Sequence, residues 1–295
     1  MSVTERMVAL AEDRWPSSGV PDDALGQVLL ASHLLGADRA VANFGGGNTS
    51  AKGRATDHVG REIDVMWVKG SGSDLATMTG RDFTPLRLGE MLPLFERAEM
   101  SDEDMVAHLA RCQVDPAAPR SSIETLLHAF VPAPHVHHTH PDGINVLAGT
   151  ADGERLVHEC FGDEAAWIPY IRPGFTLARQ VGAAVRENPA LKLAVLAKHG
   201  LVVWGDTAEE AYRRTIDVIN RAVEFVNART AGAARFDGPA AAGAEPPERL
   251  LREALPALRG AVSSERSKVL VVDLSPRVRE FVGSRARPRR PAWRA

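Results

Sequence analysis

The sequence predicts an α/β or α+β fold in which helices lie on both sides of one sheet. Strand-like and helix-like segments are mixed along the chain, which is the pattern expected of a layered fold. The composition agrees, because 44% of the 295 residues are hydrophobic and 25% are charged, as in ordinary globular domains. That length suffices for one large domain or two modest ones.

The first part of the chain is predicted to hold a helix followed by strands. Asp22-Asp23 is expected to cap an amphipathic helix that ends near Gly36. Residues 41–52 are expected to form a strand, a tight glycine turn and a second strand, and residues 63–68 a further strand. The patterns that follow predict helices over 89–98, over 102–112 and from Ser121 onward.

The next part is predicted to place buried strands between helices. Residues 135–140 are expected to form a strand that ends at Pro141-Asp142-Gly143, and residues 193–204 two strands that meet at His199-Gly200. Asp206-Thr207 is expected to cap the longest helix, whose apolar stripe runs to Val226. The remaining segments are predicted as helices over 144–161 and 175–186 and a short strand over 167–171.

The domain organisation follows from a change in composition near the end of the longest helix. We expect one catalytic domain over residues 1–230, then a linker rich in Ala, Gly and Pro over 231–247. Residues 248–283 are expected to form a short extension, with a helix over 248–262, a strand over 268–274 and a short helix near 276–282. The Arg- and Pro-rich tail, residues 284–295, has no periodicity and is expected to be disordered.

Charge and cysteine content narrow the class of protein. The formal net charge of -3 gives no broad basic field, so we expect neither a nucleic acid nor a membrane as partner. The two cysteines cannot form a disulfide framework. The N-terminus lacks the features of a signal peptide, and no apolar run approaches the roughly 20 residues that span a bilayer. We therefore expect a cytoplasmic protein.

A cluster of histidines is the first sign of chemistry, because four of the ten lie within residues 135–140. Side chains alternate faces along a strand, so His138 and His140 are expected to point the same way and to share a metal. His199, where two apolar strands meet, is the best candidate for a third ligand, and Gly200 leaves room for its close approach. Three protein ligands with an open position are typical of catalytic zinc.

Two alternatives to this metal site remain open at the level of sequence. His135 and His137 face the opposite side of the same strand, and a register error of one residue would exchange the two pairs. We favour His138 and His140 because they lie beside the break at Pro141, at the end of the strand. The other alternative is a run of hydrogen-bonded or exposed histidines that hold no metal.

Three separated segments are suited to bind phosphate. Residues 45–50, Gly-Gly-Gly-Asn-Thr-Ser, and residues 69–73, Lys-Gly-Ser-Gly-Ser, are glycine turns whose N–H groups can form an anion-binding nest. Ser121-Ser122 is expected to open a helix, where free N–H groups favour an anion. The alternatives are a hairpin turn, a plain loop and a helix cap. The spacing matches neither a Walker A loop nor a dinucleotide-binding fingerprint.

Glu124 is the candidate acid/base group, because it is predicted to lie in the first turn of the helix that Ser121-Ser122 opens. A carboxylate near a metal-bound, enolisable substrate can take a proton from carbon or return one. The alternative is a capping box, since Glu124 follows Ser121 by three residues. His128, one turn later, is interpreted as a packing or surface residue rather than a ligand.

Together these segments resemble the class II aldolase/adducin N-terminal domain family. The matching stretches are NFGGGNTS (43–50), VKGSGSDL (68–75), SSIETLLH (121–128), HHTHP (137–141) and AKHGLV (197–202). Their order and spacing match as well, over about residues 25–230. Within the family, the sequence is closest to the aldolase half of bacterial bifunctional rhamnulose-1-phosphate aldolase/alcohol dehydrogenases. No nicotinamide-binding glycine fingerprint follows residues 268–274, so we expect the dehydrogenase half to be missing and the Arg/Pro tail to be an unnatural or frameshifted end.

The resemblance implies a role for each matching residue. The family's metal histidines map to His138, His140 and His199, and its catalytic glutamate maps to Glu124. Its phosphate contacts map to Gly47, Asn48, Ser71, Gly72, Ser121 and Ser122. One departure affects the serines, because smaller members have Ser-Ser-Glu without the intervening Ile123 found here. Either Ser122 alone contacts phosphate, or the turn has a different shape.

The resemblance also implies a fold, an activity and an assembly. The fold is a central, mainly antiparallel sheet flanked by helices. The reaction is reversible cleavage of a ketose 1-phosphate, with L-rhamnulose 1-phosphate the best match, into dihydroxyacetone phosphate and an aldehyde, L-lactaldehyde. The cofactor is a divalent metal, for which zinc is expected, and the assembly a homo-oligomer, usually a tetramer. The alternatives are a pentulose-phosphate 4-epimerase, a metal-dependent dehydratase, and a non-catalytic interaction module like adducin.

Overall fold

The computed structural model describes residues 8–231, 248–275 and 278. The chain divides into two compact units, residues 1–231 and 232–295. Most of the expected linker, the short helix near 276–282 except for Val278, and the whole tail lie outside the described residues. The assignment of these parts as a catalytic domain, a linker and an extension stays a prediction. No helix in the described ranges has the length and apolar character needed to cross a membrane.

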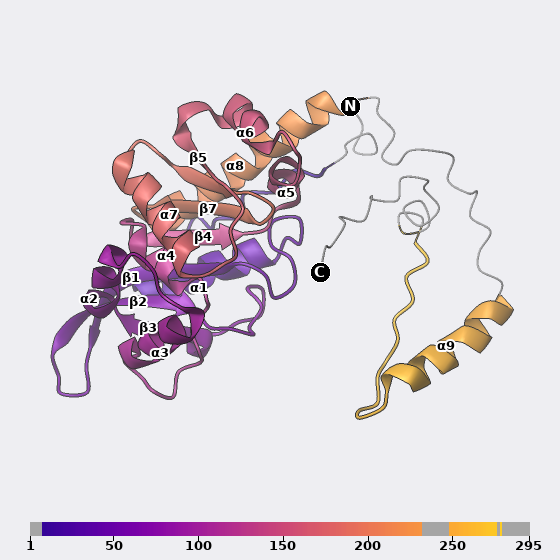
Figure 1. The fold of residues 1–295 in the computed structure, drawn as a ribbon, viewed down its shortest axis with the longest axis horizontal. Helices are drawn as coiled ribbons and strands as arrows, with labels where there is room; N and C mark the ends of the chain where they lie inside the picture. The colour runs from indigo at the N-terminus through magenta and orange to yellow at the C-terminus, as the bar shows by residue number, and fades with distance from the viewer. Residues whose placement is uncertain (1–7, 232–247, 276–277, 279–295) are drawn as a thin grey trace. The chain divides into compact units, whose positions relative to one another are not determined.

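The first unit is built on a seven-stranded sheet, which Figure 1 shows as a twisted layer among helices. The strands lie in the order β3-β2-β1-β4-β7-β6-β5. All neighbouring pairs are antiparallel except β5 and β6, which are parallel. The prediction of a mainly antiparallel sheet is therefore confirmed. The strand bounds are β1 Asn48–Thr56, β2 Glu62–Lys69, β3 Phe83–Arg87, β4 His135–Thr139, β5 Ala165–Ile168, β6 Leu193–Leu196 and β7 Gly200–Gly205.

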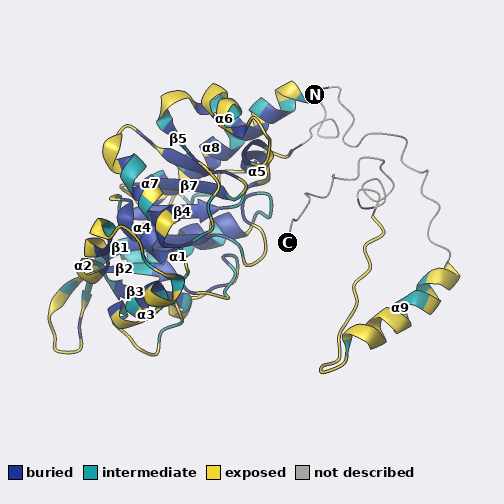
Figure 2. Cartoon of the chain, in the orientation of Figure 1, coloured by how far each residue is buried: buried dark blue, intermediate teal, exposed yellow. Residues whose placement is uncertain are grey.

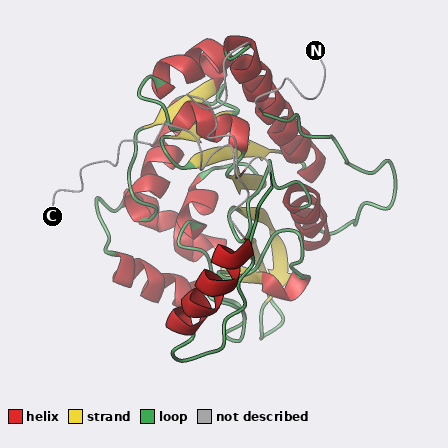
Figure 3. Ribbon diagram, turned by 90° about the vertical axis from the view of Figure 1, so that its right-hand side faces the viewer, coloured by secondary structure: helices red, strands yellow, loops and turns green. Residues whose placement is uncertain are grey.

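Helices cover both faces of this sheet, as Figure 3 shows by the strands enclosed between helices. On one face, side chains of α2, α3, α4 and α7 form a core with those of alternate strand positions such as Val136 and Val202. On the other face, α1, α5, α6 and α8 pack on the intervening positions, such as Leu201 and Val203. The helix bounds are α1 Ala24–Gly36, α2 Leu88–Met91, α3 Asp102–Cys112, α4 Thr125–Phe130, α5 Asp142–Ala148, α6 Gly153–Phe161, α7 Phe175–Glu187 and α8 Ala208–Arg229.

The longest helix illustrates how the sequence pattern determines an element. The Thr207 side chain caps α8 by accepting a hydrogen bond from the Glu210 N–H. The predicted stripe is buried throughout, at Ala208, Ala211, Thr215, Ile219, Ala222 and Val226. Figure 2 shows this division, with dark blue along the sheet and yellow on the outward helix surfaces. Apolar residues at helical spacing therefore attach α8 to the sheet.

Two local predictions near the N-terminal half are wrong, and hydrogen bonds explain both. Residues 41–44 form a turn rather than a strand, because the Val41 and Ala42 N–H groups both bond the Asp38 carbonyl. The helix expected from Ser121 begins only at Thr125, since the Ser122 carbonyl accepts from the N–H and hydroxyl of Thr125 and starts a turn. Residues 121–124 therefore lie outside the helix.

Two further differences concern strands. The pattern did not predict β3, which contains Pro85 and lies at the edge of the sheet, the position where proline is tolerated in a strand. In the second unit, helix α9 spans Glu248–Val262 as predicted. The strand expected over 268–274 is wrong, because these residues have no regular structure and no β-ladder partner among the described residues.

Candidate metal and phosphate site

Three histidine rings converge at one end of the sheet. The ring centroids of His138 and His140 lie 4.8 Å apart, those of His138 and His199 4.8 Å, and those of His140 and His199 5.1 Å. One nitrogen from each ring can be chosen so that all three lie within 4.8 Å of one another. The structure thus brings together the three residues that the sequence analysis selected as metal ligands. Their role as ligands stays a prediction.

The antiparallel sheet accounts for this convergence. Strand β4 ends at Thr139, between His138 and His140, and the neighbouring β7 begins at Gly200, immediately after His199. A side chain at Gly200 could not be accommodated, because its Cβ would lie 2.5 Å from the Thr139 carbonyl oxygen and 2.8 Å from the His140 ring. Gly200 therefore allows the two chain segments to approach, as the sequence predicted.

Hydrogen bonds fix which nitrogen of two rings faces the centre. His138 Nδ1 lies 2.9 Å from the Leu201 carbonyl oxygen, and His140 Nδ1 lies 3.2 Å from Asn43 Oδ1. Both oxygens only accept, so each Nδ1 donates its proton and each Nε2 faces the centre. The two Nε2 atoms are 3.0 Å apart. In its neutral form, a ring in this tautomer offers the Nε2 lone pair to a cation.

The protonation states of the rings also suit a metal. Burial, together with the neighbouring histidine charges, lowers the pKa of His140 to about 4, and burial followed by the His138 charge lowers the pKa of His199. Both rings are therefore neutral near neutral pH, which is the form that binds a metal ion. The donor set of three imidazoles fits a divalent metal such as zinc.

The rival histidine pair lies on the other face of the sheet. His137 is buried against α8, with Nδ1 3.3 Å from Thr215 Oγ1, and burial lowers the pKa of this ring to about 3. Neither His135 nor His137 belongs to the group of closely spaced side chains in the described residues that could hold a metal ion. The geometry thus favours His138 and His140, the pair that the sequence analysis preferred.

Glu124 points at the histidines instead of capping a helix. Its Oε2 lies 3.5 Å from His138 Nε2, and its Oε1 lies 3.5 Å from His199 Nε2. Glu124 occupies the N-cap position of α4, but its side chain makes no capping hydrogen bond. The capping-box alternative therefore does not describe this residue, and the carboxylate is available to the site.

The protonation state of Glu124 results from opposing effects. Burial raises its pKa, whereas the charges of His138 and His199 and a hydrogen bond from Asn48 lower it, and the net shift is downward. Oε1 is buried and has no hydrogen-bond partner among the described residues. An ionised carboxylate with one unpartnered oxygen can accept a proton from a bound molecule.

The first glycine turn and Ser122 meet beside Glu124. Asn48 Nδ2 donates to Glu124 Oε2 at 2.8 Å and to Ser122 Oγ at 3.3 Å. Gly47 has a φ of 72°, and a Cβ there would lie 2.7 Å from the His138 carbonyl oxygen. Glycine is thus required where the turn passes the end of β4. Gly47, Asn48 and Ser122 are placed within reach of one ligand.

The second loop lies beside the first part of the serine segment. Gly70 forms a β-bridge with Ser121, and the Ser71 N–H donates to the Arg120 carbonyl at 2.8 Å. Ser71 and Gly72 are exposed to solvent. The structure therefore gathers all six predicted phosphate contacts, from three loops, around the end of the sheet. Their function in phosphate binding stays a prediction.

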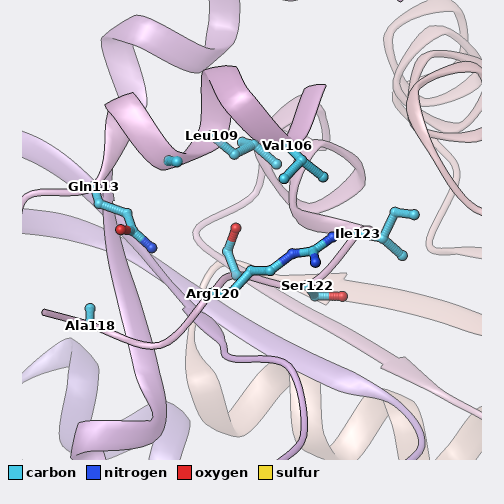
Figure 4. Close-up of a pocket in the computed structure, with 9 residues that line it drawn as sticks. Val106, Leu109, Gln113, Ala118, Arg120, Ser122 and Ile123 are labelled. Carbon is cyan, nitrogen blue, oxygen red and sulfur yellow. The ribbon is translucent and has the colours of Figure 1, made fainter. Parts of the chain in front are cut away.

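A pocket of about 300 Å³ adjoins the two serines. It lies between α3 and the loop that precedes α4, with Val106 and Leu109 on one side and Ser122 and Ile123 on the other, as Figure 4 shows. The Arg120 side chain extends along this pocket in the same view. A ligand held at Ser122 would therefore have an open space next to it.

Asp74 is a structurally important residue that the sequence analysis did not select. Its carboxylate accepts two hydrogen bonds from Arg39, at 3.0 and 3.1 Å, and one from the Gly45 N–H at 2.8 Å. The Arg39 guanidinium also stacks on the Phe44 ring, with Cζ 3.9 Å from the centroid. Asp74 therefore ties the loop that follows β2 to the glycine turn before β1. Its position at the end of the motif at 68–75 was the signal available in the sequence.

Comparison with known protein families identifies one matching model. It is described as the class II aldolase and adducin N-terminal domain, and it matches residues 27–224. This range includes all ten predicted site residues and the two strands, β4 and β7, that place the histidines. The match thus covers the part of the chain in which the candidate site lies.

Two individual relatives are similar to much of this chain. The uncharacterized oxidoreductase YuxG of Bacillus subtilis (strain 168) is 45% identical over 260 residues, which are 88% of this chain and 38% of the relative. The chain therefore spans well under half the length of that protein. The N-terminal class II aldolase domain of a conserved Thermoplasma acidophilum protein is 39% identical, with a TM-score of 0.68, over 73% of this chain and 99% of that one.

A more distant structure shares the fold alone. The sugar-phosphate aldolase from Thermotoga maritima is 13% identical, with a TM-score of 0.51, over 72% of this chain and 97% of that one. At this level of identity, the similarity shows a common architecture and says nothing about the substrate.

Proposed function

The chain belongs to the class II aldolase and adducin N-terminal domain family, and we propose that it is a metal-dependent aldolase acting on a ketose 1-phosphate. The proposed products are dihydroxyacetone phosphate and an aldehyde. The observation that supports this most strongly is the convergence of His138, His140 and His199 with the Glu124 carboxylate, 3.5 Å from two of the rings. A non-catalytic module has no need of this arrangement.

The site residues would divide the work of the reaction. When bound by the three histidines, a divalent metal supplies Lewis-acid stabilisation of the charge that develops on the ketone oxygen. Glu124 would hold the proton that is exchanged with carbon 3 of the substrate as the bond between carbons 3 and 4 breaks or forms. Its unpartnered Oε1 is the oxygen available for that transfer.

The loops around Glu124 would bind and orient the phosphate end. Ser122 Oγ accepts hydrogen bonds from the Glu124 N–H at 3.2 Å and from Asn48 Nδ2, so its own hydrogen is free to donate to a phosphate oxygen. Ser71, Gly72 and Ser121 lie in the adjoining loops. Fixing the phosphate in this way would hold carbon 3 near the carboxylate.

Our proposed substrate is L-rhamnulose 1-phosphate, which would give L-lactaldehyde as the second product. The support is the resemblance of the motifs to the aldolase half of the bifunctional enzymes. By the same resemblance we propose that the chain forms a homo-oligomer, a tetramer in most relatives, that zinc is the metal, and that the protein acts in the cytoplasm.

The test is an assay of dihydroxyacetone phosphate release from several ketose 1-phosphates, with the protein loaded with zinc. We expect release from L-rhamnulose 1-phosphate, and slower release from its diastereomers. Epimerisation or dehydration without any dihydroxyacetone phosphate would instead assign the site to one of the alternative reactions. An assembled, zinc-loaded protein that acts on none of these substrates would contradict the proposed function.

A further inference from the structure

A buried hydrogen-bond chain connects Ser50 and His128, which are not among the candidate site residues, to the candidate site. His128, on α4, is fully buried, and its Nδ1 lies 2.8 Å from Ser50 Oγ. Its Nε2 contacts Asn48 Oδ1, and Asn48 Nδ2 in turn donates to Glu124 Oε2. The chain thus runs from Ser50 through His128 and Asn48 to the candidate acid/base group.

The sheet register and the helix spacing explain why these groups meet. Asn48 and Ser50 are two residues apart on β1, so their side chains lie on the same face. Glu124 and His128 are four residues apart, with a hydrogen bond from the His128 N–H to the Glu124 carbonyl. The strand and the helix therefore present two matched pairs of side chains to each other.

The direction of the chain follows from counting donors and acceptors. Burial, followed by the charge of His138, lowers the pKa of His128 to about 3, so the ring is neutral and carries one proton. With the proton on Nε2, the ring donates to Asn48 Oδ1 and Nδ1 accepts from the Ser50 hydroxyl. Every group in the chain is then satisfied.

The opposite tautomer would leave buried groups unsatisfied. A proton on Nδ1 would require Nε2 to accept from Asn48, which turns the carboxamide and points its oxygen at Glu124 Oε2. Two oxygens would then face each other at 2.8 Å, the present distance between Asn48 Nδ2 and Oε2. An unpaired buried polar group is costly, and Oε2 would lose its donor as well.

We propose that His128 is a positioning residue, whose Nε2–H tautomer sets the orientation of the Asn48 carboxamide and thereby that of Glu124. Asn48 then holds Oε2 and leaves Oε1, which faces His199, as the oxygen that exchanges the substrate proton. It also presents Nδ2 to Ser122. The role in proton exchange rests on the proposed function, whereas the hydrogen-bond chain itself does not.

The first experiment reads the tautomer directly and needs no activity. Protein labelled with nitrogen-15 in histidine is studied by NMR, and the His128 ring is assigned as the signal absent from the His128→Gln variant. We expect a neutral ring with hydrogen on Nε2 and a free lone pair on Nδ1 near neutral pH. A ring protonated on Nδ1, or on both nitrogens, overturns the proposal whatever the enzyme does.

The second experiment compares two variants of the same residue on the proposed reaction. His128→Gln retains an N–H donor near the Nε2 position, whereas His128→Leu fills similar space without one. We expect His128→Leu to lower kcat by about 10- to 100-fold, with less change in KM, and His128→Gln to restore most of the rate. Metal content is measured for both, because an unchanged value shows that the histidine site is intact.

The outcomes separate the inference from the proposed function. Equal loss in both variants, or an unchanged kcat in His128→Leu, shows that His128 only fills space and contradicts the inference. If His128→Leu fails to fold, His128→Asn decides, since its shorter amide keeps an N–H donor but withdraws it from Asn48, and a kcat equal to that of His128→Gln overturns the proposal. Inactivity of the unmodified protein contradicts the proposed function. The NMR result then tests the hydrogen-bond chain independently of activity.

Discussion

The chemistry of the candidate site depends on where individual ring protons lie. His138 and His140 donate from Nδ1 to oxygen acceptors, which directs both Nε2 atoms inward, 3.0 Å apart. His128 uses the opposite nitrogen, because its Nε2 must donate to Asn48. Three histidines of one small region are thus held in defined tautomers by their neighbours, and two of these, His138 and His140, belong to the expected metal site together with His199.

A substitution of the candidate acid/base group tests its role at this scale. We expect Glu124→Gln to retain the metal, because the three imidazoles remain, but to slow proton exchange on dihydroxyacetone phosphate by about 100- to 10,000-fold. The exchange is measured as uptake of solvent deuterium at carbon 3. Unchanged exchange in a variant with full metal content would place the base elsewhere.

Much of the site was predictable at the level of residues, and the reasons are specific. Strand alternation selected His138 and His140, and an apolar strand junction selected His199. Hydrogen-bonding roles were not predictable, because they depend on contacts between distant segments. The sequence predicts a packing or surface role for His128, and its burial agrees with packing, but its hydrogen bonds with Ser50 and Asn48, about 80 residues away, were not predictable.

At the scale of elements, the site is formed by loops that a few hydrogen bonds hold together. The glycine turn before β1 and the loop after β2 are joined by Asp74, which bonds both Arg39 and the Gly45 N–H. The loop after β2 is joined to the serine segment by the bridge between Gly70 and Ser121. Three segments far apart in the sequence therefore form one surface.

The Asp74 link can be tested by its dependence on pH. The Arg39 hydrogen bonds, with burial opposing them, lower the pKa of Asp74 to about 2. A lowered carboxyl pKa stabilises the fold above the unfolded value of about 3.9 and loses that effect as the pH falls toward the folded value. We expect Asp74→Asn to lower the free energy of unfolding by roughly 1 to 2 kcal/mol near pH 7.

Urea unfolding of the two proteins at several pH values measures this difference. It should shrink as the pH falls from about 4 to about 2, because the wild-type carboxylate becomes protonated there. Asn is the matched substitution, since it keeps the size and one acceptor for the Gly45 N–H. A difference that stays constant across this range would show that the charge of Asp74 contributes nothing.

Helices and strands with a clear hydrophobic periodicity in the sequence were predicted most accurately. Long amphipathic helices with clear caps, such as α1 and α8, were predicted nearly to the residue. Errors arose where local hydrogen bonds competed with the pattern, as in residues 41–44, or where proline concealed an edge strand, as in β3. The apolar run at 268–274 resembles a strand, but a strand also requires a partner, and sequence periodicity does not supply one.

At the scale of the whole first unit, the mainly antiparallel sheet places the start of one strand beside the end of its neighbour. In this sheet, β4 ends beside the first residues of β1 and of β7. Asn48, His138 and His199 therefore lie at the same end of the sheet. Helices pack on both faces of the sheet through two apolar cores and hold this end in place. The fold therefore provides a rigid platform on which three loops complete the site.

The most direct test of this account is the metal content of the purified protein after exposure to zinc and dialysis. We predict about one zinc per chain in the wild type and in His135→Ala, which removes a histidine of the rival pair, and none in a folded His138→Ala. Zinc retained at full occupancy in His138→Ala, or absent from a folded wild type, would contradict the claim that the three converging imidazoles hold a metal.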